Sequence, residues 1–574
     1  MKHTVLFALT SLSCLGMGAQ NKEAIRLNQV GHFPLQEKYV VVDGKHTTAE
    51  MTVTDDQGRV VVQKAPTRTV VSPWSGKKRT LYDLSELQNT GLYTVKVDRL
   101  QAPLTINDRP FHSLALASLR SFYLIRSGID ISKELGGVYA RKDGHPDTKV
   151  YIHPSAVSPG RPAESVISSP YGWYDAGDYN KYVVNSSFTI GLILQVYQQI
   201  PQYFQKLNTN IPESNNQTPD LLDEMMFNLK WLLTMQDPAD GGVYHKLTTP
   251  QFESFVMPTE CHQKRYVVAK SVTAALDFAA VMAMSARLFQ GNKDYPQFSA
   301  QARTAAQKAY AWALKNPSAL YQQAKMNLKF TPQVATGEYG DNNAQDEKFW
   351  AATELYLLTG KKTYRNDALA LFPATLDAPS WATVATLGQL SWLQSKDSAL
   401  KKRTLQQLQR YCDQLISQVS TSNFQAPYGD KATDFGWGCL GGSCCTPGIL
   451  LLFADRYVQP SHYFKYALQN LDYLLGRNAT GYCYVTGFGN QRPMHPHHRI
   501  SAADGITEPF PGLLVGGPNP MQQDKASDNL VYPSNHPDES YLDEQPSYAS
   551  NEIAINWNAA LVGLACWIDA SAAQ

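Results

Sequence analysis

The feature that most constrains the fold is a helical period that runs through most of the chain. From about residue 112 onward, apolar residues recur at intervals of three and four, which places them on one face of an α-helix. This spacing predicts about a dozen helical segments: 114–125, 188–198, 220–235, 271–289, 300–314, 346–358, 364–372, 381–393, 404–419, 447–457, 463–475 and 553–570. No short tandem repeat is present, so a solenoid is not expected. We therefore expect a ring of paired helices whose cleft is built from the loops at one end.

Residues 24–106 show a different pattern, made of short runs of β-branched residues. The runs cover residues 39–42, 51–54, 60–62, 69–71 and 92–97, and turn residues such as Gly58, Gly76 and Gly91 lie between them. Several short strands at this spacing are typical of a β-sandwich. The sequence therefore predicts two domains, a small all-β sandwich over 24–106 and an all-α domain over 112–574.

Charge and the N-terminus narrow the class of function. The 574 residues carry a formal net charge of +1, so we expect no nucleic-acid partner. Lys2 and His3 precede an apolar run over 4–15, which is too short for a membrane-spanning helix of about 20 residues. We expect residues 1–19 to be a signal peptide of a secreted, periplasmic or cell-surface protein. Lipidation of Cys14 is the alternative.

The cysteines give no disulfide framework. Seven remain after the signal peptide, with Cys439, Cys444 and Cys445 close together, and no CxxC pair is present. Buried free thiols are the favoured interpretation. One bridge within the group of three is the alternative.

A first candidate catalytic motif places two carboxylates on either side of Ala-Gly, just before a predicted helix. The segment reads Tyr171-Gly-Trp-Tyr-Asp175-Ala-Gly-Asp178-Tyr-Asn-Lys-Tyr182. Gly177 permits a tight backbone path, so Asp175 and Asp178 can point at one small volume. Like charges held close compete for a proton unless water or donors separate them, and a water bound between them is a ready nucleophile. An Asx-turn and a calcium-binding loop are the alternatives.

A second motif is a loop rich in hydrogen-bond donors. Three histidines fall in four positions, His495-Pro-His497-His498, and Arg499 follows them. Histidines at this density suggest a metal, but Pro496 breaks helical geometry and Arg499 places a fixed positive charge beside the ligands. We favour a loop that binds hydroxyl groups, with the metal site as the alternative.

A third motif lies over residues 547–557, at the start of the last predicted helix. Ser550 or Asn551 suits the N-cap, which places Glu552 in the first helical turn. The helix dipole there lowers the pKa of a carboxyl group, whereas a catalytic acid needs a raised pKa. Burial among Tyr548 and Trp557 would raise it.

Together the three motifs resemble glycoside hydrolase family 9, the inverting cellulases. Asp175-Ala-Gly-Asp178-Tyr matches the family's water-binding loop, Pro496-His-His-Arg499 its substrate-binding signature, and Asn551-Glu552-Ile-Ala-Ile-Asn-Trp-Asn its proton-donor segment. Ile25-Arg-Leu-Asn-Gln-Val-Gly31 resembles the opening of the immunoglobulin-like module that precedes many of these catalytic domains. The resemblance implies an all-α (α/α)6 barrel preceded by a small all-β immunoglobulin-like sandwich.

The resemblance also implies a role for each acid. Asp178 would be the general base that deprotonates water, Asp175 would help to hold that water, and Glu552 would protonate the leaving oxygen. In an inverting enzyme the acid and the base stand roughly 6.5–9.5 Å apart, which leaves room for the water. His497 and Arg499 would hold hydroxyl groups of the sugar at the cleavage point.

Further residues are expected to bind the sugar chain. His245 resembles a sugar-binding position of the family, and Trp557 stands where relatives carry an aromatic residue near the acid, with Tyr548 beside it. The candidate stacking surfaces are Trp173, Trp350, Trp381 and Trp437. Core packing is the alternative for each of them.

The family resemblance implies no cofactor for catalysis. Many immunoglobulin-bearing relatives carry a zinc site built from Cys and His, but the region around His153 has no cysteine, so that zinc is not expected. Structural calcium is common in the family, and its ligands cannot be assigned from this sequence.

We therefore expect a monomeric, inverting endo-β-1,4-glucanase that acts on cellulose-type glucan, mixed-linkage glucan or xyloglucan. The nearest alternative is an exo-acting β-glucosidase, cellobiohydrolase or exo-glucosaminidase of the same fold. An alternative of another class is a glycan-binding surface protein that has lost catalysis, against which the intact Asp175, Asp178 and Glu552 argue.

Overall fold

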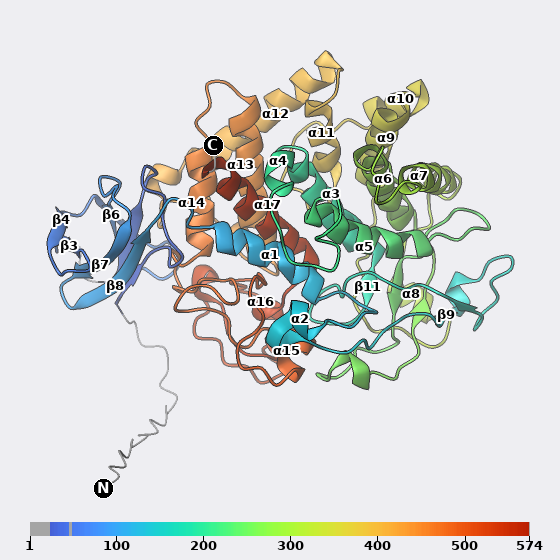
Figure 1. Ribbon diagram of the computed structural model, residues 1–574, viewed down its shortest axis with the longest axis horizontal. Coiled ribbons are helices and arrows are strands. Elements are labelled where there is room, and N and C mark those ends of the chain that lie inside the picture. Colours follow the sequence, from blue (N-terminus) through green and yellow to red (C-terminus); the bar gives the residue numbers. More distant parts are fainter. Residues whose placement is uncertain (1–22, 45–48, 573–574) are drawn as a thin grey trace, which may run out of the picture.

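The computed structural model describes residues 23–44 and 49–572. The expected signal peptide, residues 1–19, and Cys14 lie outside the described residues. A β-sandwich lies beside a larger helical domain, which the last helix crosses near its middle (Figure 1). None of the described helices has both the length and the apolar character that crossing a membrane requires.

The sandwich consists of two antiparallel four-stranded sheets. Their strands are β1 Ala24–Arg26, β2 Tyr39–Asp43, β3 Met51–Thr54, β4 Val60–Lys64, β5 Arg68–Val71, β6 Lys78–Asp83, β7 Gly91–Val97 and β8 Leu100–Ile106. The strand orders are β1-β2-β6-β5 and β4-β3-β7-β8. Val40 and Val42 of β2 meet Met51 and Val53 of β3 in the core between the sheets. The β-sandwich expected from the short apolar runs is confirmed.

The helical domain contains six helices that are buried on most sides and six that pack outside them. The first set is α3 Val183–Tyr197, α6 Val272–Leu288, α9 Gln345–Thr359, α11 Ala385–Leu393, α13 Thr446–Tyr457 and α17 Ile555–Ala572. The second set is α1 His112–Leu124, α5 Asp220–Thr234, α7 Phe298–Lys315, α10 Lys362–Ala370, α12 Ser398–Ile416 and α14 Phe464–Leu474. All twelve coincide with helices predicted from the apolar spacing. The expected (α/α)6 barrel is confirmed.

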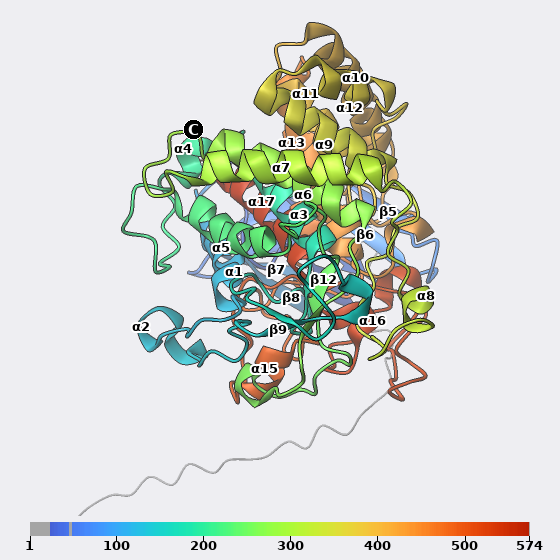
Figure 2. The same cartoon turned by 90° about the vertical axis from the view of Figure 1, so that its right-hand side faces the viewer.

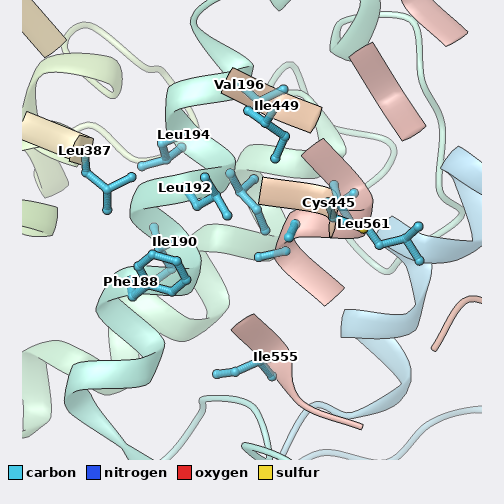
Figure 3. Packing of buried hydrophobic residues seen from close by; sticks show 14 of the residues in the cluster. Phe188, Ile190, Leu192, Leu194, Val196, Leu387, Cys445, Ile449, Ile555 and Leu561 are labelled. Carbon is cyan, nitrogen blue, oxygen red and sulfur yellow. The ribbon is translucent and has the colours of Figure 1, made fainter. Parts of the chain in front are cut away.

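The inner and outer helices differ in how many of their faces are buried, because their apolar residues are distributed differently. In α3, every residue from Val183 to Val196 is buried, as expected for a helix that is apolar all round. In α12, the buried residues are Leu400, Thr404, Gln407, Leu408 and Cys412, a single stripe at helical spacing. Figure 3 shows the interior, where labelled side chains of α3, α11, α13 and α17, among them Ile190, Leu387 and Ile449, gather in one apolar cluster.

A continuous apolar strand explains how the sandwich meets the barrel. All five residues of β2 are buried, because Val40 and Val42 face the sandwich core while Tyr39 and Val41 join the barrel core. Buried Arg79 of β6 pairs with Asp43 of the sandwich and, at 2.8 Å, with Asp538 of the barrel. Buried ion pairs of this kind fix relative position more than they add stability.

The connections that precede the six inner helices gather at one end of the barrel, the lower end in Figures 1 and 2, where α8 Gln323–Asn327, α15 Arg499–Ala503 and α16 Tyr548–Asn551 lie. They also form a five-stranded sheet in the order β10-β9-β13-β12-β11. Its strands are β9 Val150–Ile152, β10 Val166–Ile167, β11 Lys181–Tyr182, β12 Lys246–Thr248 and β13 Tyr266–Val267. Strands of two or three residues are too short to show a period of two, so the sequence did not predict this sheet.

The seven cysteines that the structure describes are all free thiols. Cys439, Cys444 and Cys445 lie buried at the start of α13, in and beside a π-helical turn over Leu440–Cys445. The interpretation as buried free thiols is confirmed for this group.

Candidate active site

Asp175 and Asp178 lie on the loop that leads through β11 into α3, and both are buried. Both carboxylate oxygens of Asp175 accept hydrogen bonds. Nδ2 of Asn185 donates to Oδ1 at 2.8 Å, and the hydroxyl of Tyr339 donates to Oδ2 at 2.7 Å. Asp175 is therefore held by side chains from two different elements, α3 and the loop before α9.

The hydrogen bonds to Asp178 are arranged differently. The hydroxyl of Tyr182 donates to Oδ2 at 3.0 Å, and Nδ2 of Asn180 donates to the same oxygen. Within residues 23–44 and 49–572, no donor reaches Oδ1. Asp178 thus has one oxygen that is fixed by the protein and one that is available to water or substrate.

The charge on Asp178 affects its neighbour. Burial, followed by the negative charge of Asp178, raises the pKa of Asp175 to about 8, against the opposing effect of the donors Tyr339 and Asn185. Two close carboxylates in a buried site do not readily ionise together. At neutral pH Asp175 therefore retains its proton.

Glu552 lies in extended backbone, not in the first turn of a helix. It follows α16, its φ and ψ are −69° and 155°, and α17 begins only at Ile555. The prediction of a helical first turn was wrong because Glu552 forms a bridge with His497 and its carbonyl accepts from the amide of Gly516 at 2.8 Å. These contacts between distant segments outweigh the local helix signal.

The environment of Glu552 suits a proton donor. Burial, followed by the charge of Asp178, raises the pKa of Glu552 to about 8. The amide of Gly177 donates to its Oε1 at 3.3 Å and opposes this rise. In the part of the chain that the structure describes, no donor reaches Oε2. The carboxyl group therefore holds its proton at neutral pH and has an oxygen free to deliver it.

Gly177 joins the three motifs. A Cβ at this position would lie 2.3 Å from the carbonyl oxygen of His497 and 3.1 Å from Oε1 of Glu552, closer than a side chain allows. The carbonyl of Gly177 accepts from the amide of Arg499 at 3.1 Å and from its Nη1 at 2.7 Å. Glycine is needed here for the close approach of three segments.

The histidines of the donor-rich loop do not converge on one point. His497 donates through Nδ1 to the carbonyl of Gln545 at 2.8 Å, whereas buried His498 pairs with Ser501 and His495 is exposed. Burial lowers the pKa of His497 to about 4, so its Nε2 is a neutral acceptor. Across residues 23–44 and 49–572, no three His, Cys, Asp or Glu side chains are grouped for a metal ion.

Four aromatic side chains lie around the acids on the same end of the barrel. Trp437 is 52% exposed, and its ring centroid lies 5.5 Å from that of Tyr548. Trp381, partly exposed, packs edge-on against Tyr339 at 5.0 Å. Trp557 lies under the backbone of Gly438, where a Cβ would come within 2.3 Å of its ring. Trp437, Tyr548 and Trp381 retain ring surface that a sugar could reach.

Three of the residues that were expected to bind sugar have fully buried side chains. Trp350 and Trp173 are fully buried in the barrel, so the expectation that they are stacking surfaces was wrong. His245 is also fully buried. Its two ring nitrogens form hydrogen bonds with Ser271 and with the carbonyl of Glu338, and its ring stacks on that of Tyr321 with the centroids 4.0 Å apart. Since both nitrogens are occupied, His245 does not contact a sugar directly in this structure.

The sequence did not reveal the donors that organise the acids. Asn185, Tyr182, Asn180 and Tyr339 hold the two aspartates. Asn180 and Tyr182 belong to the first motif, but nothing in that motif predicted them as donors to Asp178, and Asn185 and Tyr339 lie outside all three motifs. A polar residue near the start of an apolar helix, such as Asn185 in α3, is the one signal that could have pointed to a buried partner.

The chain was compared with known proteins. The family model for Glycosyl hydrolase family 9 matches residues 111–565, and that for the Cellulase N-terminal ig-like domain matches residues 20–102. A xyloglucan-specific endo-beta-1,4-glucanase from Bacteroides ovatus is 53% identical over 559 residues, which cover 96% of this chain and 94% of that protein. Endoglucanase D from Acetivibrio thermocellus is 32% identical, over 96% of this chain and 81% of its own length.

A solved structure agrees with these sequence relatives. The structure described as Bacteroides ovatus GH9 has a TM-score of 0.91 and 51% identity, and the match covers 96% of this chain and 99% of the other. The resemblance inferred from three short motifs therefore extends over both domains. This protein belongs to glycosyl hydrolase family 9 and is a glycoside hydrolase of the inverting endo-β-1,4-glucanase type, with a glycan as its substrate.

Proposed function

We propose that this protein cleaves the main chain of xyloglucan at internal positions, with Asp178 as the base, Glu552 as the acid and Asp175 as the residue that holds the attacking water. The main support for this proposal is the distribution of hydrogen bonds over the three carboxyl groups. Among the residues that the structure describes, no donor reaches one oxygen of Asp178 and one oxygen of Glu552, while both oxygens of Asp175 are occupied.

The free Oδ1 of Asp178 supports its role as base. A general base must reach the proton that it removes, directly or through one water. In a single displacement, Asp178 takes a proton from water, the water oxygen attacks the anomeric carbon, and the bond to the leaving oxygen breaks as Glu552 protonates it. We expect roughly 6.5–9.5 Å between the two carboxyl groups.

Asp175 contributes position more than proton transfer. Each carboxyl oxygen can accept more than one hydrogen bond, so Asp175 can still bind a water while Asn185 and Tyr339 hold it. Its carbonyl also accepts from the amide of Ile555 at 2.9 Å, the first residue of α17. Asp175 thus connects the water-binding loop to the helix that follows the acid.

Glu552→Gln tests the acid directly, because glutamine keeps the shape of glutamate but cannot protonate the leaving oxygen. Turnover on a β-1,4-glucan should fall by several orders of magnitude while oligosaccharide binding, measured by calorimetry, persists. Exposed Glu260→Gln is the matched control and should behave as wild type. Near-normal hydrolysis by Glu552→Gln would contradict the assignment of Glu552 as the acid.

His497 and Arg499 are proposed to bind hydroxyl groups of the sugar at the cleavage point. Arg499 donates through Nε to the carbonyl of Glu253 at 2.8 Å and through Nη1 to Gly177, while no acceptor for its Nη2 lies among the described residues. Nε2 of His497 is available as an acceptor. We propose Trp437, Tyr548 and Trp381 as stacking surfaces and Trp557 as support for the acid.

Xyloglucan is proposed as the substrate for two reasons. The relative that is 53% identical is named as xyloglucan-specific. In addition, a cavity of about 410 Å³ opens between the loop of Trp381 and the loop of Trp437, lined in part by Ser380, Tyr411 and Gly442. We propose that this cavity adjoins the main-chain cleft and receives a sugar branch, which xyloglucan carries and cellulose lacks.

Gly442→Phe tests the pocket. A Cβ at Gly442 has no atom within 4 Å, so a large side chain can enter the cavity without displacing the backbone. We expect kcat/KM on xyloglucan to fall at least tenfold while kcat/KM on unbranched β-1,4-glucan changes little, and Gly442→Ala to act as wild type. Equal losses on both substrates would contradict a branch pocket.

Internal cleavage distinguishes this proposal from an exo-acting enzyme. Cleavage inside the chain lowers the viscosity of xyloglucan early, when few reducing ends have formed, whereas removal of terminal sugars does not. Product analysis over time on xyloglucan, mixed-linkage glucan, cellulose and chitosan oligomers decides between endo and exo action. The absence of any product would favour the glycan-binding alternative.

Enzymes of this family catalyse without a cofactor. We also propose that the protein is a monomer and that residues 1–19 direct its export, with or without lipidation of Cys14. We further propose a structural calcium ion. In the described part of the chain, the carboxyl oxygens of buried Asp277 and Glu347 have no hydrogen-bond partner, and burial raises the pKa of Glu347 to about 11. Calcium bound near these carboxyls would ionise them, so a chelator should then lower Tm; an unchanged Tm would exclude a stabilising calcium.

A further inference from the structure

We propose that Lys246 is a positioning residue for the catalytic base. Its buried ammonium group is linked to Asp178 by two routes, holds the side chain of Asp178 in place and fixes which of its oxygens faces the water. The inference rests on the proposed role of Asp178 as base.

Lys246 is a buried cation. It has no exposed surface, and its Nζ donates to the carbonyl of Gly337 at 2.5 Å, to Oε1 of Gln323 at 2.7 Å and to Oγ1 of Thr336 at 3.0 Å. Each of these partners can accept, and an ammonium group has three protons to donate. No carboxylate in residues 23–44 and 49–572 forms an ion pair with it.

A buried cation without an ion-pair partner is costly to retain. Burial lowers the pKa of Lys246 to about 7, and the negative charges of Asp178 and Glu338 oppose that shift. Glu338 is exposed to solvent, which screens its charge, whereas Asp178 is buried. Asp178 is therefore the main counter-charge for Lys246, although the two groups do not touch.

The first route runs through an aromatic ring. Tyr182 of β11 pairs with Lys246 of β12, and Nζ lies 5.5 Å from the centroid of the Tyr182 ring. The hydroxyl of the same ring donates to Oδ2 of Asp178 at 3.0 Å. A cation on the ring withdraws electron density from it and strengthens the hydroxyl as a donor.

The second route is a chain of hydrogen bonds. Oγ1 of Thr336 accepts from Lys246 and lies 2.6 Å from Oγ1 of Thr248, which in turn lies 3.2 Å from Oδ1 of Asn180. Nδ2 of Asn180 donates to Oδ2 of Asp178. The single hydroxyl proton of Thr248 is shared between Oδ1 of Asn180 and the closer carbonyl of Thr249, at 2.8 Å, so this route is the weaker of the two. An ammonium group cannot accept, so the first bond of the chain points from Lys246 to Thr336.

The other charged groups near Asp178 have mixed effects. Asp175 and Glu552 repel its negative charge whenever they are charged, while Arg499 lies near Glu552 and buried Arg265 donates to the carbonyl of the adjacent Tyr179 at 3.0 Å. Beside Lys246, burial lowers the pKa of His245 to about 3, so that ring is neutral. Both routes from Lys246 end on Oδ2, the oxygen of Asp178 that protein donors already occupy.

Lys246→Met removes the charge and keeps the length of the side chain. In a pH profile of kcat/KM on soluble β-1,4-glucan, we expect the acidic limb to move up by about one pH unit, with KM nearly unchanged, because the base loses a buried positive charge that is linked to it. Lys246→Arg keeps the charge and should return the limb toward the wild-type position.

Lys181→Met is the matched control. Lys181 is also a fully buried lysine, on the paired strand β11, but its Nζ pairs with Asp147 at 2.7 Å. This variant should lose stability without moving the acidic limb. A uniform loss of rate at every pH in Lys246→Met, with the limb unmoved, would overturn the proposal.

Two further variants cover the remaining outcomes. If Lys246→Met does not fold, Thr248→Val cuts the hydrogen-bond chain while Lys246 stays in place, and the limb should move in the same direction by a smaller amount. An unmoved limb in a folded Thr248→Val would then overturn the proposal. Asp178→Asn separates this test from the proposed function, since an active Asp178→Asn would refute Asp178 as base whatever Lys246 does.

Discussion

The main-chain amide of Gly177 donates a hydrogen bond to Oε1 of Glu552 across 3.3 Å. This bond joins the loop that carries Asp178, the proposed base, to Glu552, the proposed acid, which lies 375 residues further along the chain than Gly177. Since the carbonyl of Gly177 also accepts from Arg499, the three motifs that the sequence separates meet at one residue without a side chain. The geometry of catalysis therefore depends on a glycine that takes no part in proton transfer.

Gly177→Ala should reduce kcat by at least a hundredfold. The added methyl group would lie 2.3 Å from the carbonyl of His497, so the loop or the His497 segment must shift, and small displacements of catalytic groups are costly. Steady-state kinetics on β-1,4-glucan measure the effect. Gly442→Ala, where the space at Cβ is open, is the control, and equal activity of the two variants would contradict the role given to Gly177.

Asp178→Asn should be more severely impaired than Asp175→Asn. The first removes the base, whose Oδ1 has no protein donor within residues 23–44 and 49–572, whereas the second changes a residue already held by Asn185 and Tyr339. Turnover numbers at the pH optimum compare them. If Asp175→Asn were the less active variant, the result would contradict the proposal, and the roles of Asp175 and Asp178 would have to be exchanged.

The alkaline limb of the pH profile should fall near pH 8. The acid must be protonated to act, and the pKa of Glu552 is raised to about 8, so activity is present below that value and is lost as the pH rises through it. The charge of Asp175 contributes to the raised pKa of Glu552, so Asp175→Asn should move the limb to slightly lower pH, whereas exposed Glu260→Gln is the control and should leave it in place. Constant kcat/KM from pH 7 to 10 in the wild type would contradict the raised pKa.

Glu552→Gln should make the folded protein more stable. The pKa of Glu552 is about 8 when folded and near its ordinary value of 4.5 when unfolded, so the native state of the wild type loses stability as the pH rises from 4.5 to 8. The variant lacks this loss, and its Tm advantage should grow over that range. Thermal unfolding at several pH values measures it, with Glu260→Gln as the control; a difference that is constant with pH would contradict the argument.

The sequence predicted the helices well and the surroundings of the acids poorly, for physical reasons. Helices such as α6 and α17 are long enough for the three- and four-residue period to identify them. Glu552 was placed in a helix because local signals cannot report its bridge to distant His497. Trp350 and Trp381 look equivalent in sequence, yet only packing decides that the first is buried in the barrel and the second lies at its open end.

The central claim is that Asp178 and Glu552 act on opposite sides of one sugar unit, with a water between Asp178 and the anomeric carbon. Proton NMR of the first-formed reducing end, recorded before the anomers equilibrate, tests it most directly. Attack by that water on a β-linked glucan gives the α-anomer first. Initial appearance of the β-anomer would contradict the assignment, because it requires a covalent intermediate and a nucleophile in place of the base.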